Sequence, residues 1–397
     1  MSGKGTALAR ERDNARQYTD VTIRGVKTGK DRRRFLELPY RLYKNDPNWV
    51  APLRMAQKDI LNTLKHPFYQ TSDVELYLAE RQGRVVGRIM AIFNRAYNEF
   101  HQENGGAFGF FEVENDREAA AALIGAARSW LRERGAEVMR GPFNPSTNYE
   151  CGLLVDGYDR PPVVMMTFNP PYYVDLLEAC GLKKAMDLYA YDVEHKSFNL
   201  SEKLKRVADR TRKSGVRLRT VNLKDFDREV DRIREVYNDA WSRNWGFVPY
   251  GREEFEHLAK DLKQIVDPRI VFIAEKDEPG RPEPRPIGFF LAVPDLNIAL
   301  KKLSGRLLPF GIVKLLWHSR KIHSMRIITM GSIKEFQSLG LAAMFYDEIY
   351  KRSPEVGYPL GEMSWILENN ILMNRAAKML GGRLSKTYRI YEVSLAG

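Results

Sequence analysis

Cysteine is nearly absent from this 397-residue chain, which carries only Cys151 and Cys180. Two cysteines exclude a disulfide scaffold and any zinc site built from four cysteines. The six histidines are dispersed without the spacing of metal ligands. No run of about 18 apolar residues occurs, so the sequence predicts no membrane-spanning helix. The polar, charged N-terminus is unlike a secretory signal. These absences predict a soluble, cytoplasmic protein without a bound metal.

Aromatic residues, in contrast, are plentiful, with 6 Trp, 19 Tyr and 19 Phe. This content excludes a largely disordered chain, which would bury too little apolar surface to offset the entropy of ordering. The 29 Gly and 20 Pro follow no period, which excludes collagen-like and low-complexity classes. The length favours two domains or one large one.

Positive charge is in excess, with a formal net charge of +12 that favours an anionic partner. Residues 1–34 hold ten Lys or Arg and four acids. Because residues 1–20 lack apolar periodicity, we expect them to form a flexible basic tail. A second basic block, residues 296–334, holds eight Lys or Arg and no acid, interleaved with Leu, Ile, Phe and Trp.

The order of expected elements repeats once along the chain. A strand over 21–26 and a helix reaching Tyr43 have counterparts about 195 residues later, in a strand over 216–221 and a helix reaching Tyr237. Each half continues with a hairpin, a strand, a helix, a strand, a helix and a last strand. No gap-free identity accompanies the repeat, so coincidence between two ordinary α/β halves stays as the alternative.

The sequence therefore predicts an α/β protein of two domains of one design. The first domain is expected over 21–195 and the second over 216–397. A surface helix rich in Lys and Arg is expected within the linker, 196–215.

The sharpest motif follows a β-branched run, Arg326–Met330, which predicts a strand. After a short turn, residues 337–342 (Gln-Ser-Leu-Gly-Leu-Ala) open a helix with apolar residues at helical spacing. Free N–H groups and the dipole at a helix N-terminus favour a bound pyrophosphate. Gly340 allows the backbone to approach the phosphates closely.

Gln337-x-x-Gly340-x-Ala342 resembles the Gln/Arg-x-x-Gly-x-Gly/Ala signature of the GNAT acyltransferases, and the element order of residues 216–397 is similar to that superfamily. The resemblance implies two tandem GNAT-like domains, each a twisted mixed sheet flanked by helices. It implies acyl-CoA as co-substrate, with no tightly bound cofactor, and a pantetheine arm lying where two strands splay apart. The residues then expected to contact CoA are Gln337, Ser338, Leu339, Gly340, Leu341, Ala342 and Asn370; Asn370 equally suits a structural role.

The first half resembles the same fold but lacks the signature at the corresponding turn, residues 114–119. Its pyrophosphate cradle is therefore doubtful, and the domain is expected to be a degenerate copy. Residues 141–150 and 169–173 instead mix polar groups with Pro and Gly. They suit either turn chemistry alone or an acceptor-binding surface facing the second domain. For the latter, the expected contacts are Asn144, Asn148 and Tyr172.

The resemblance also implies a direct attack of an amine on the acyl thioester, which is helped by a general base. Glu368 follows the fifth strand of the second half, where a base could face the cleft; a helix-capping or surface carboxylate is the alternative. His318 and His323 in the basic block could also be bases; histidines at the surface or at an interface are the alternative. The last helix lacks the Tyr that protonates the leaving thiolate in many relatives, so Tyr388 or Tyr391 on the terminal strand could substitute, unless they only pack.

The segment 299–323 is an insertion relative to a minimal GNAT domain. It is basic and apolar and contains Trp317, which we expect to contact substrate. The pattern suits contact with an anionic membrane or an acyl-chain channel, or else a buried helical hairpin. In its overall layout, with Pro294-Asp295-Leu296-Asn297 at the insertion, the chain is similar to bacterial ceramide synthases, which acylate a sphingoid base.

The leading interpretation is an acyl-CoA-dependent N-acyltransferase that acts on a hydrophobic, sphingoid-type amine to give an amide such as ceramide. It is expected in the cytoplasm, at the inner membrane face if the insertion docks there. A small-molecule or peptide N-acetyltransferase is a second interpretation, and a non-catalytic binding protein is a third. No nucleic-acid partner is expected, because no recognition motif accompanies the diffuse positive charge.

Overall fold

The computed structural model of the protein describes residues 20–396. Apart from Asp20, the basic tail expected over residues 1–20 lies outside the described residues. The first half contains β1 Val21–Gly25, α2 Gly29–Leu42, α3 Arg54–Ile60, η1 Pro67–Gln70, β2 Ser72–Arg81, β3 Arg84–Asn94, α4 Arg95–His101, β4 Gly105–Val113, α5 Arg117–Arg132, β5 Val138–Gly141, β6 Phe143–Asn144, β7 Glu150–Cys151, β8 Leu153–Asp156, α6 Tyr172–Ala179 and β9 Lys183–Glu194.

The second half follows the same order of main elements, with the longer segment α10–α11 in place of α4 and without counterparts of β6, β7 and β8. It contains η2 His195–Ser197, α7 Glu202–Lys213, β10 Val216–Thr220, η3 Leu223–Asp225, α8 Phe226–Trp241, α9 Arg252–Lys263, η4 Pro268–Ile270, β11 Val271–Lys276, β12 Arg285–Pro294, α10 Asn297–Leu300, α11 Gly311–Ser319, β13 Ser324–Ser332, η5 Lys334–Leu339, α12 Leu341–Glu355, β14 Leu360–Leu367, α13 Ile371–Met379 and β15 Arg383–Ser394.

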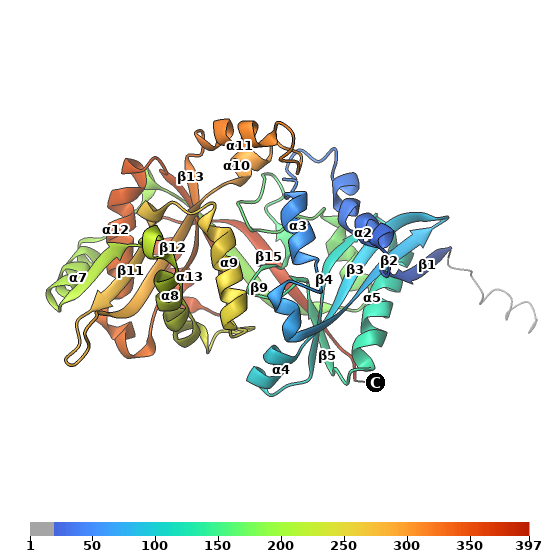
Figure 1. Ribbon diagram of the computed structural model, residues 1–397, viewed down its shortest axis with the longest axis horizontal. Coiled ribbons are helices and arrows are strands. Elements are labelled where there is room, and N and C mark those ends of the chain that lie inside the picture. Colours follow the sequence, from blue (N-terminus) through green and yellow to red (C-terminus); the bar gives the residue numbers. More distant parts are fainter. Residues whose placement is uncertain (1–19, 397) are drawn as a thin grey trace, which may run out of the picture.

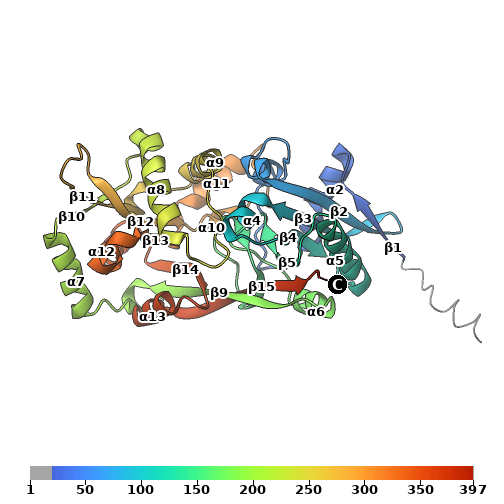
Figure 2. The ribbon, with the colours of Figure 1, turned by 90° about the horizontal axis from the view of Figure 1, so that it is seen from below.

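One mixed sheet runs through both halves in the order β1-β2-β3-β4-β5-β15-β9-β14-β13-β12-β11-β10. The two halves exchange their last strands: β15 pairs with β5 of the first half, and β9 pairs with β14 of the second. Pairs β4–β5 and β13–β14 are parallel, whereas the other pairs along this path are antiparallel. Figures 1 and 2 show the two halves side by side with β9 and β15 between them. The predicted α/β fold with a repeated mixed sheet is confirmed.

Helices cover both faces of the second half because side chains alternate along its strands. On β12, the Phe289 ring lies 5.4 Å from the ring of Trp241 on α8. The next residue, Phe290, points the other way, and its ring lies 6.0 Å from that of Phe345 on α12. Helix α8 therefore covers one face of the sheet and α12 the opposite face.

Strands β13 and β14 pair only at their beginnings, over Ser324–Ile327 and Leu360–Met363. Beyond this point they diverge, and the register of each with its other neighbour shifts, next to Ala292 in β12 and after Met363 in β14. Such irregularities bend a strand away from its partner. We call the resulting space between residues 328–332 and 364–367 the strand gap.

The equivalent gap of the first half is filled by its own chain. Strands β4 and β5 pair over only three residues, and β6 then lies against β4. A Cβ atom at Gly109 would collide with the carbonyl oxygen of Phe143. The Asn144 side chain accepts the N–H of Phe110 at 2.7 Å. These contacts close the gap between β4 and β5 in the first half.

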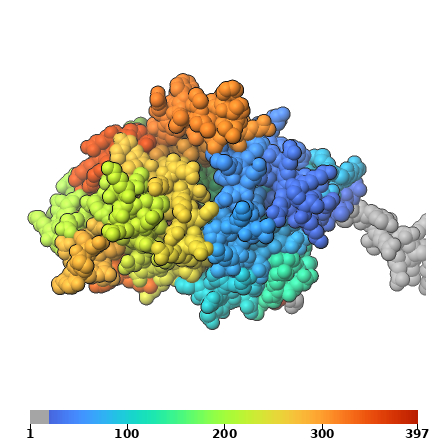
Figure 3. Space-filling view, in the orientation of Figure 1, coloured from blue at the N-terminus to red at the C-terminus, as the bar shows by residue number. Residues whose placement is uncertain are grey.

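The insertion forms α10 and α11, which lie over the junction of the two halves (Figure 3). Leu300 and Leu303 pack with Val50 of the first half. Helix α11 and the turn before it instead expose six large apolar side chains: Leu308, Phe310, Ile312, Val313, Leu316 and Trp317. The sequence allowed either a buried helical hairpin or a segment that contacts a membrane or an acyl chain. Burial holds only for the first part of the segment, around Leu300 and Leu303. Among residues 20–396, no helix has the length and hydropathy to cross a membrane.

Candidate functional site

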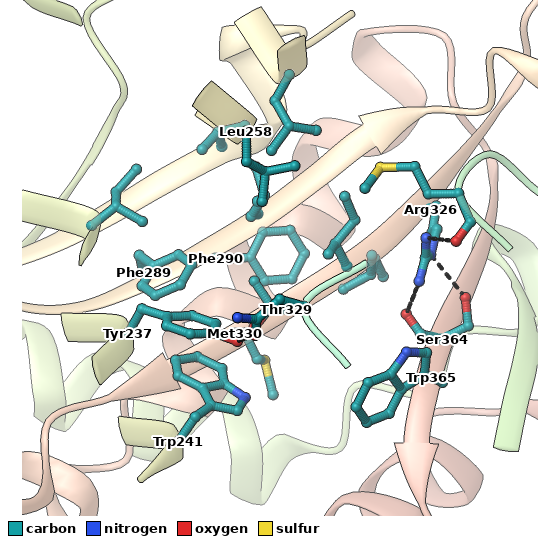
Figure 4. A pocket seen from close by; sticks show the side chains of 18 of the residues that line it. Tyr237, Trp241, Leu258, Phe289, Phe290, Arg326, Thr329, Met330, Ser364 and Trp365 are labelled. Carbon is teal, nitrogen blue, oxygen red and sulfur yellow. Dashed lines mark hydrogen bonds between the residues drawn. The ribbon is translucent and has the colours of Figure 1, made fainter. Parts of the chain in front are cut away.

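An apolar cavity of about 300 Å³ lies in the second half, between the sheet and helices α8 and α9 (Figure 4). Its wall on this face is aliphatic and aromatic, with Val230, Ile233, Leu258, Ala259 and Leu262 from the two helices. The helices are amphipathic, so their apolar sides face the sheet. Few polar groups interrupt this wall, and an apolar ligand therefore fits it best.

The cavity also reaches the other face of the sheet, because Tyr346 of α12 and Met373 of α13 line it. Five consecutive residues of β13, Arg326–Met330, contribute to its wall. Consecutive residues point to opposite faces, so the cavity passes through the sheet at the strand gap. Along the gap, β13 has no strand partner on the β14 side beyond Ile327, which leaves its backbone groups available to a ligand that carries amides.

The turn expected to hold pyrophosphate precedes α12. Gly340 has φ 86°, a left-handed conformation that favours glycine. A Cβ atom there would also come within 2.5 Å of Val207 on α7, and the Thr211 hydroxyl of α7 donates to the Leu339 carbonyl at 2.5 Å. Gln337, Ser338 and Ala342 are exposed, whereas the Leu341 side chain is buried in the core. The backbone N–H groups in the first turn of α12, which no side chain caps, are the donors that this turn offers to a phosphate.

The two residues expected to act as base and acid lie outside the wall of the cavity. Glu368 accepts the Lys184 ammonium at 2.7 Å and the backbone N–H of Asp187 at 3.0 Å. Tyr388 is fully buried, burial raises the pKa of its hydroxyl, and that hydroxyl lacks a hydrogen-bond partner within residues 20–396. Asn370 does line the cavity, and its side chain caps α13 by accepting the Met373 N–H at 3.1 Å.

Of the residues expected to contact the acceptor, the structure brings one to the cavity. Asn148 lines it and bridges the halves, since its amide donates to the Val248 carbonyl at 3.1 Å and accepts the Tyr237 hydroxyl at 3.3 Å. Asn144 holds the first-half gap closed, as described above. The Tyr172 hydroxyl donates to the Val113 carbonyl at 2.9 Å within the first half. Trp317 lies on the exposed face of α11.

Arg326 is a cavity residue that the sequence pattern did not identify. Its buried guanidinium donates to the carbonyls of Val164 and Met165 at 3.0 and 2.8 Å, and its Nε donates to the Ser364 hydroxyl at 3.1 Å (Figure 4). The Arg therefore ties a first-half loop to both strands at the start of the gap. In the sequence it stands inside a β-branched run, which marks the strand but not this role.

The chain is similar in sequence to two known bacterial proteins. No family model matches the chain. A bacterial ceramide synthase from Caulobacter vibrioides is 40% identical over 383 residues, 95% of this chain and 98% of that protein. Protein YghO of Escherichia coli is 34% identical over 372 residues, 91% of this chain and 92% of that protein.

Solved structures show the same fold at low identity. A tandem GNAT protein from the clavulanic acid biosynthesis pathway matches with a TM-score of 0.55 and 12% identity, over 95% of this chain and 99% of that one. A GCN5-related N-acetyltransferase from Anabaena variabilis matches with a TM-score of 0.51 and 9% identity, over 95% and 73%. The expected tandem GNAT fold is thereby confirmed.

Proposed function

This chain belongs to the family of the bacterial ceramide synthase of Caulobacter vibrioides, and we propose that it is an acyl-CoA-dependent N-acyltransferase. It transfers a long acyl chain to the amine of a hydrophobic, sphingoid-type acceptor and forms an amide such as ceramide. One observation carries the proposal: an apolar cavity continues through the strand gap from the α12–α13 face to the α8–α9 face.

In this proposal, the CoA moiety lies on the α12–α13 face. The backbone N–H groups at the start of α12 meet the pyrophosphate, with Gln337, Ser338 and Ala342 around it. The pantetheine arm enters the strand gap beside Asn370 and Met373 and pairs with the open edge of β13. The acyl chain then extends into the cavity under α8 and α9, where burial of each methylene contributes about 0.8 kcal/mol.

The first half shapes the acceptor side of the site and binds no CoA. Supporting this, β6 and Asn144 occupy its own gap, while its loop residues Thr147, Asn148 and Met165 line the second-half cavity. We also propose the domain boundaries that the sequence repeat predicts: the first domain ends near residue 195, and the second begins near residue 216. The exchange of β9 and β15 holds the two halves in the fixed arrangement that such a composite site needs.

The reaction joins the acceptor nitrogen to the thioester carbonyl carbon. The nitrogen attacks, the C–S bond breaks, and the CoA thiolate leaves with a proton. Backbone N–H groups of β13 at the gap are placed to stabilise the negative charge that develops on the carbonyl oxygen. The surrounding apolar wall excludes water, which protects the thioester from hydrolysis.

A direct assay tests the proposal. With palmitoyl-CoA and sphinganine, the protein is expected to release CoA thiol and to form N-palmitoyl sphinganine, identified by mass spectrometry. Acetyl-CoA with soluble amines is expected to turn over at least about tenfold more slowly, because the acetyl group forgoes most of the apolar contact. Preferred turnover of acetyl-CoA with a soluble amine would instead identify an N-acetyltransferase, and the absence of any turnover would contradict the proposal.

The exposed face of α11 is proposed to dock on an anionic membrane, from which the acceptor arrives. Six large apolar side chains stand there among basic residues, and the ammonium of Lys321 lies 4.2 Å from the centroid of the Trp317 ring. Apolar groups that insert among lipid headgroups, together with Lys and Arg around them, are typical of peripheral membrane proteins. In this proposal the protein works at the inner face of the membrane.

Replacing two apolar side chains of this face with acids is expected to weaken membrane binding. We expect the double variant Leu316→Glu/Trp317→Glu to bind vesicles of phosphatidylcholine and phosphatidylglycerol at least about tenfold more weakly in co-sedimentation, since two apolar anchors are lost. Binding of acyl-CoA stays unchanged. The control is Leu384→Glu, which adds an acid at a half-exposed leucine on β15. Equal vesicle binding by the wild type, the control and the double variant would contradict the docking proposal.

A further inference from the structure

A second feature of the cavity is a hydrogen-bonded pair of titratable side chains from the two halves. Tyr149, from the loop before β7, lines the cavity. Its hydroxyl donates to Glu254 Oε1 at 2.8 Å. Glu254 stands in the first turn of α9 and is 7% exposed. The 105 residues between them and their origin in different halves explain why the sequence pattern did not single out the pair.

An aliphatic amine is protonated at neutral pH, as the pKa of lysine near 10.4 illustrates. Acyl transfer to such an acceptor therefore needs a group that removes one proton before the nitrogen attacks. We propose that the Tyr149–Glu254 pair is this group, with Tyr149 meeting the acceptor ammonium and Glu254 receiving the proton. This inference rests on the proposed acyltransferase function.

The acceptor nitrogen loses two protons during the reaction. The acceptor ammonium gives one proton to the Tyr149 oxygen, while the Tyr149 hydroxyl passes its own proton to the Glu254 carboxylate. The free amine then attacks the thioester carbonyl carbon, the C–S bond breaks, and the thiolate leaves with a second proton from the nitrogen. Glu254 finally releases its proton to solvent, so the products are the amide, CoA thiol and one proton.

The surroundings of Glu254 suit a proton acceptor that works near neutral pH. Burial raises the pKa of Glu254 to about 7, against the opposing effects of the Tyr149 hydrogen bond and His257. The other titratable groups around the pair are Tyr69, Tyr237, Tyr250, Asp261, His66 and Asp59. Burial lowers the pKa of His66 to about 4, so this ring is neutral at pH 7. A proton acceptor with a pKa near the working pH is the most effective general base.

A second group of titratable side chains lies one turn further along α9, at His257. His257 Nε2 lies 2.8 Å from Asp59 Oδ2, whose side chain is half exposed. The rings of His66 and His257 lie 4.7 Å apart, and that of His66 lies 5.8 Å from Tyr149. Asp59, His66 and His257 bring three ligand-type atoms together, but Nδ1 of His66 accepts the Phe68 N–H. The neutral ring therefore carries its proton on Nε2.

Two other buried carboxyl groups offer comparison variants. Burial raises the pKa of both Glu150 and Glu362 to about 7. Neither side chain lines the cavity, and one oxygen of Glu362 lacks a partner among residues 20–396. Like them, Glu254 is buried, but it accepts the hydroxyl of the cavity residue Tyr149. Variants of Glu150 and Glu362 therefore separate the effect of any buried titrating carboxyl from the effect of one bonded to Tyr149.

The experiment measures kcat/KM for palmitoyl-CoA and sphinganine between pH 5.5 and pH 9, a window set about the pKa near 7. In the wild type, kcat/KM is expected to rise with pH and to level off above the pKa of Glu254. We expect Glu254→Gln, whose amide oxygen still accepts the Tyr149 hydroxyl, to lower kcat/KM at least about 100-fold, within the range of general-base effects, and to abolish this rise. Tyr149→Phe is expected to lower it similarly. Glu150→Gln and Glu362→Gln are expected to keep the rise.

A second acceptor separates a chemical role from a structural one. A long-chain O-alkylhydroxylamine is neutral at pH 7 and needs no base, so Glu254→Gln should recover most of the lost activity with it. Palmitoyl-CoA binding by the variant should stay within about twofold of the wild type, because the pair is proposed to act on the acceptor alone. If the wild type is active but Glu254→Gln keeps the rise with pH, or if Glu362→Gln loses it, the inference fails while the proposed function stands. An inactive wild type refutes the proposed function itself.

Discussion

The variant Gly340→Glu is expected to bind acyl-CoA about 100-fold more weakly than the wild type, a loss of about 2.7 kcal/mol. A side chain at φ 86° strains the backbone by about 1–2 kcal/mol whether or not CoA is bound. Two further effects act on the proposed site itself. The new Cβ atom comes within 2.5 Å of Val207 on α7. The new carboxylate lies where the pyrophosphate is proposed to bind, so like charges repel. Isothermal calorimetry with palmitoyl-CoA and with free CoA measures the loss.

Gly357 offers a matched control for this prediction. It has φ 92°, near the C-terminal end of α12, and a Cβ atom there meets open space. Gly357→Glu therefore carries the same backbone strain and the same charge, 17 residues away at the end of the helix opposite to the proposed pyrophosphate site. We expect its affinity for CoA to stay within about twofold of the wild type. If circular dichroism shows that both proteins are folded and Gly340→Glu binds CoA as tightly as the wild type, the assignment of the pyrophosphate turn is wrong.

The variant Ala259→Phe is expected to change the preferred acyl chain. Ala259 lies on α9 and lines the cavity beside Leu258 and Leu262. A phenyl ring there displaces about four methylenes of the bound chain, which contribute about 0.8 kcal/mol each. We therefore expect kcat/KM for palmitoyl-CoA to fall by about 100-fold, while that for hexanoyl-CoA stays within about threefold. Turnover measured over a series of acyl-CoA chain lengths reveals the shift.

Lys260→Phe is the control, because it adds the same ring to the exposed side of α9. Its chain-length profile should match that of the wild type. Overpacking alone can destabilise a protein by 1–3 kcal/mol, so thermal melts of both variants accompany the kinetics. A parallel fall for palmitoyl-CoA and hexanoyl-CoA in Ala259→Phe would place the acyl chain elsewhere.

The elements that the sequence predicted correctly are those with local signals. The β-branched run Arg326–Met330 lies within strand β13, and Gly340 is the N-cap of helix α12, which begins at Leu341. Alternation and helical spacing depend on neighbouring residues alone, so they were sufficient to detect the repeated order of elements. The signature that begins at Gln337 is also local, and it indicated the family resemblance. The family itself and the tandem fold are confirmed by the comparisons.

Local sequence signals identified fewer residues of the candidate site than elements of the fold. Asn148 was expected to meet substrate and does line the cavity, because a polar loop among Pro and Gly is a signal of a shaped surface. Arg326 and Glu254 carried no such signal, and nothing in the sequence connected Tyr149, in the same loop as Asn148, with Glu254. Their partners lie far along the chain, with Arg326 bound to the carbonyls of Val164 and Met165 and Tyr149 bound to Glu254.

The sequence by itself determined that this is an α/β protein of two similar halves with a glycine turn suited to pyrophosphate in the second. Only the tertiary structure decided that the halves exchange β9 and β15, that the first-half gap is filled by β6, and that an apolar cavity crosses the sheet at the strand gap. The physical reason is how far apart in the sequence the residues that determine each feature lie. A turn and a helix start depend on the dihedral angles and side chains of a few adjacent residues. A cavity is the space left among packed side chains from distant segments, so it exists only once those segments have found their partners.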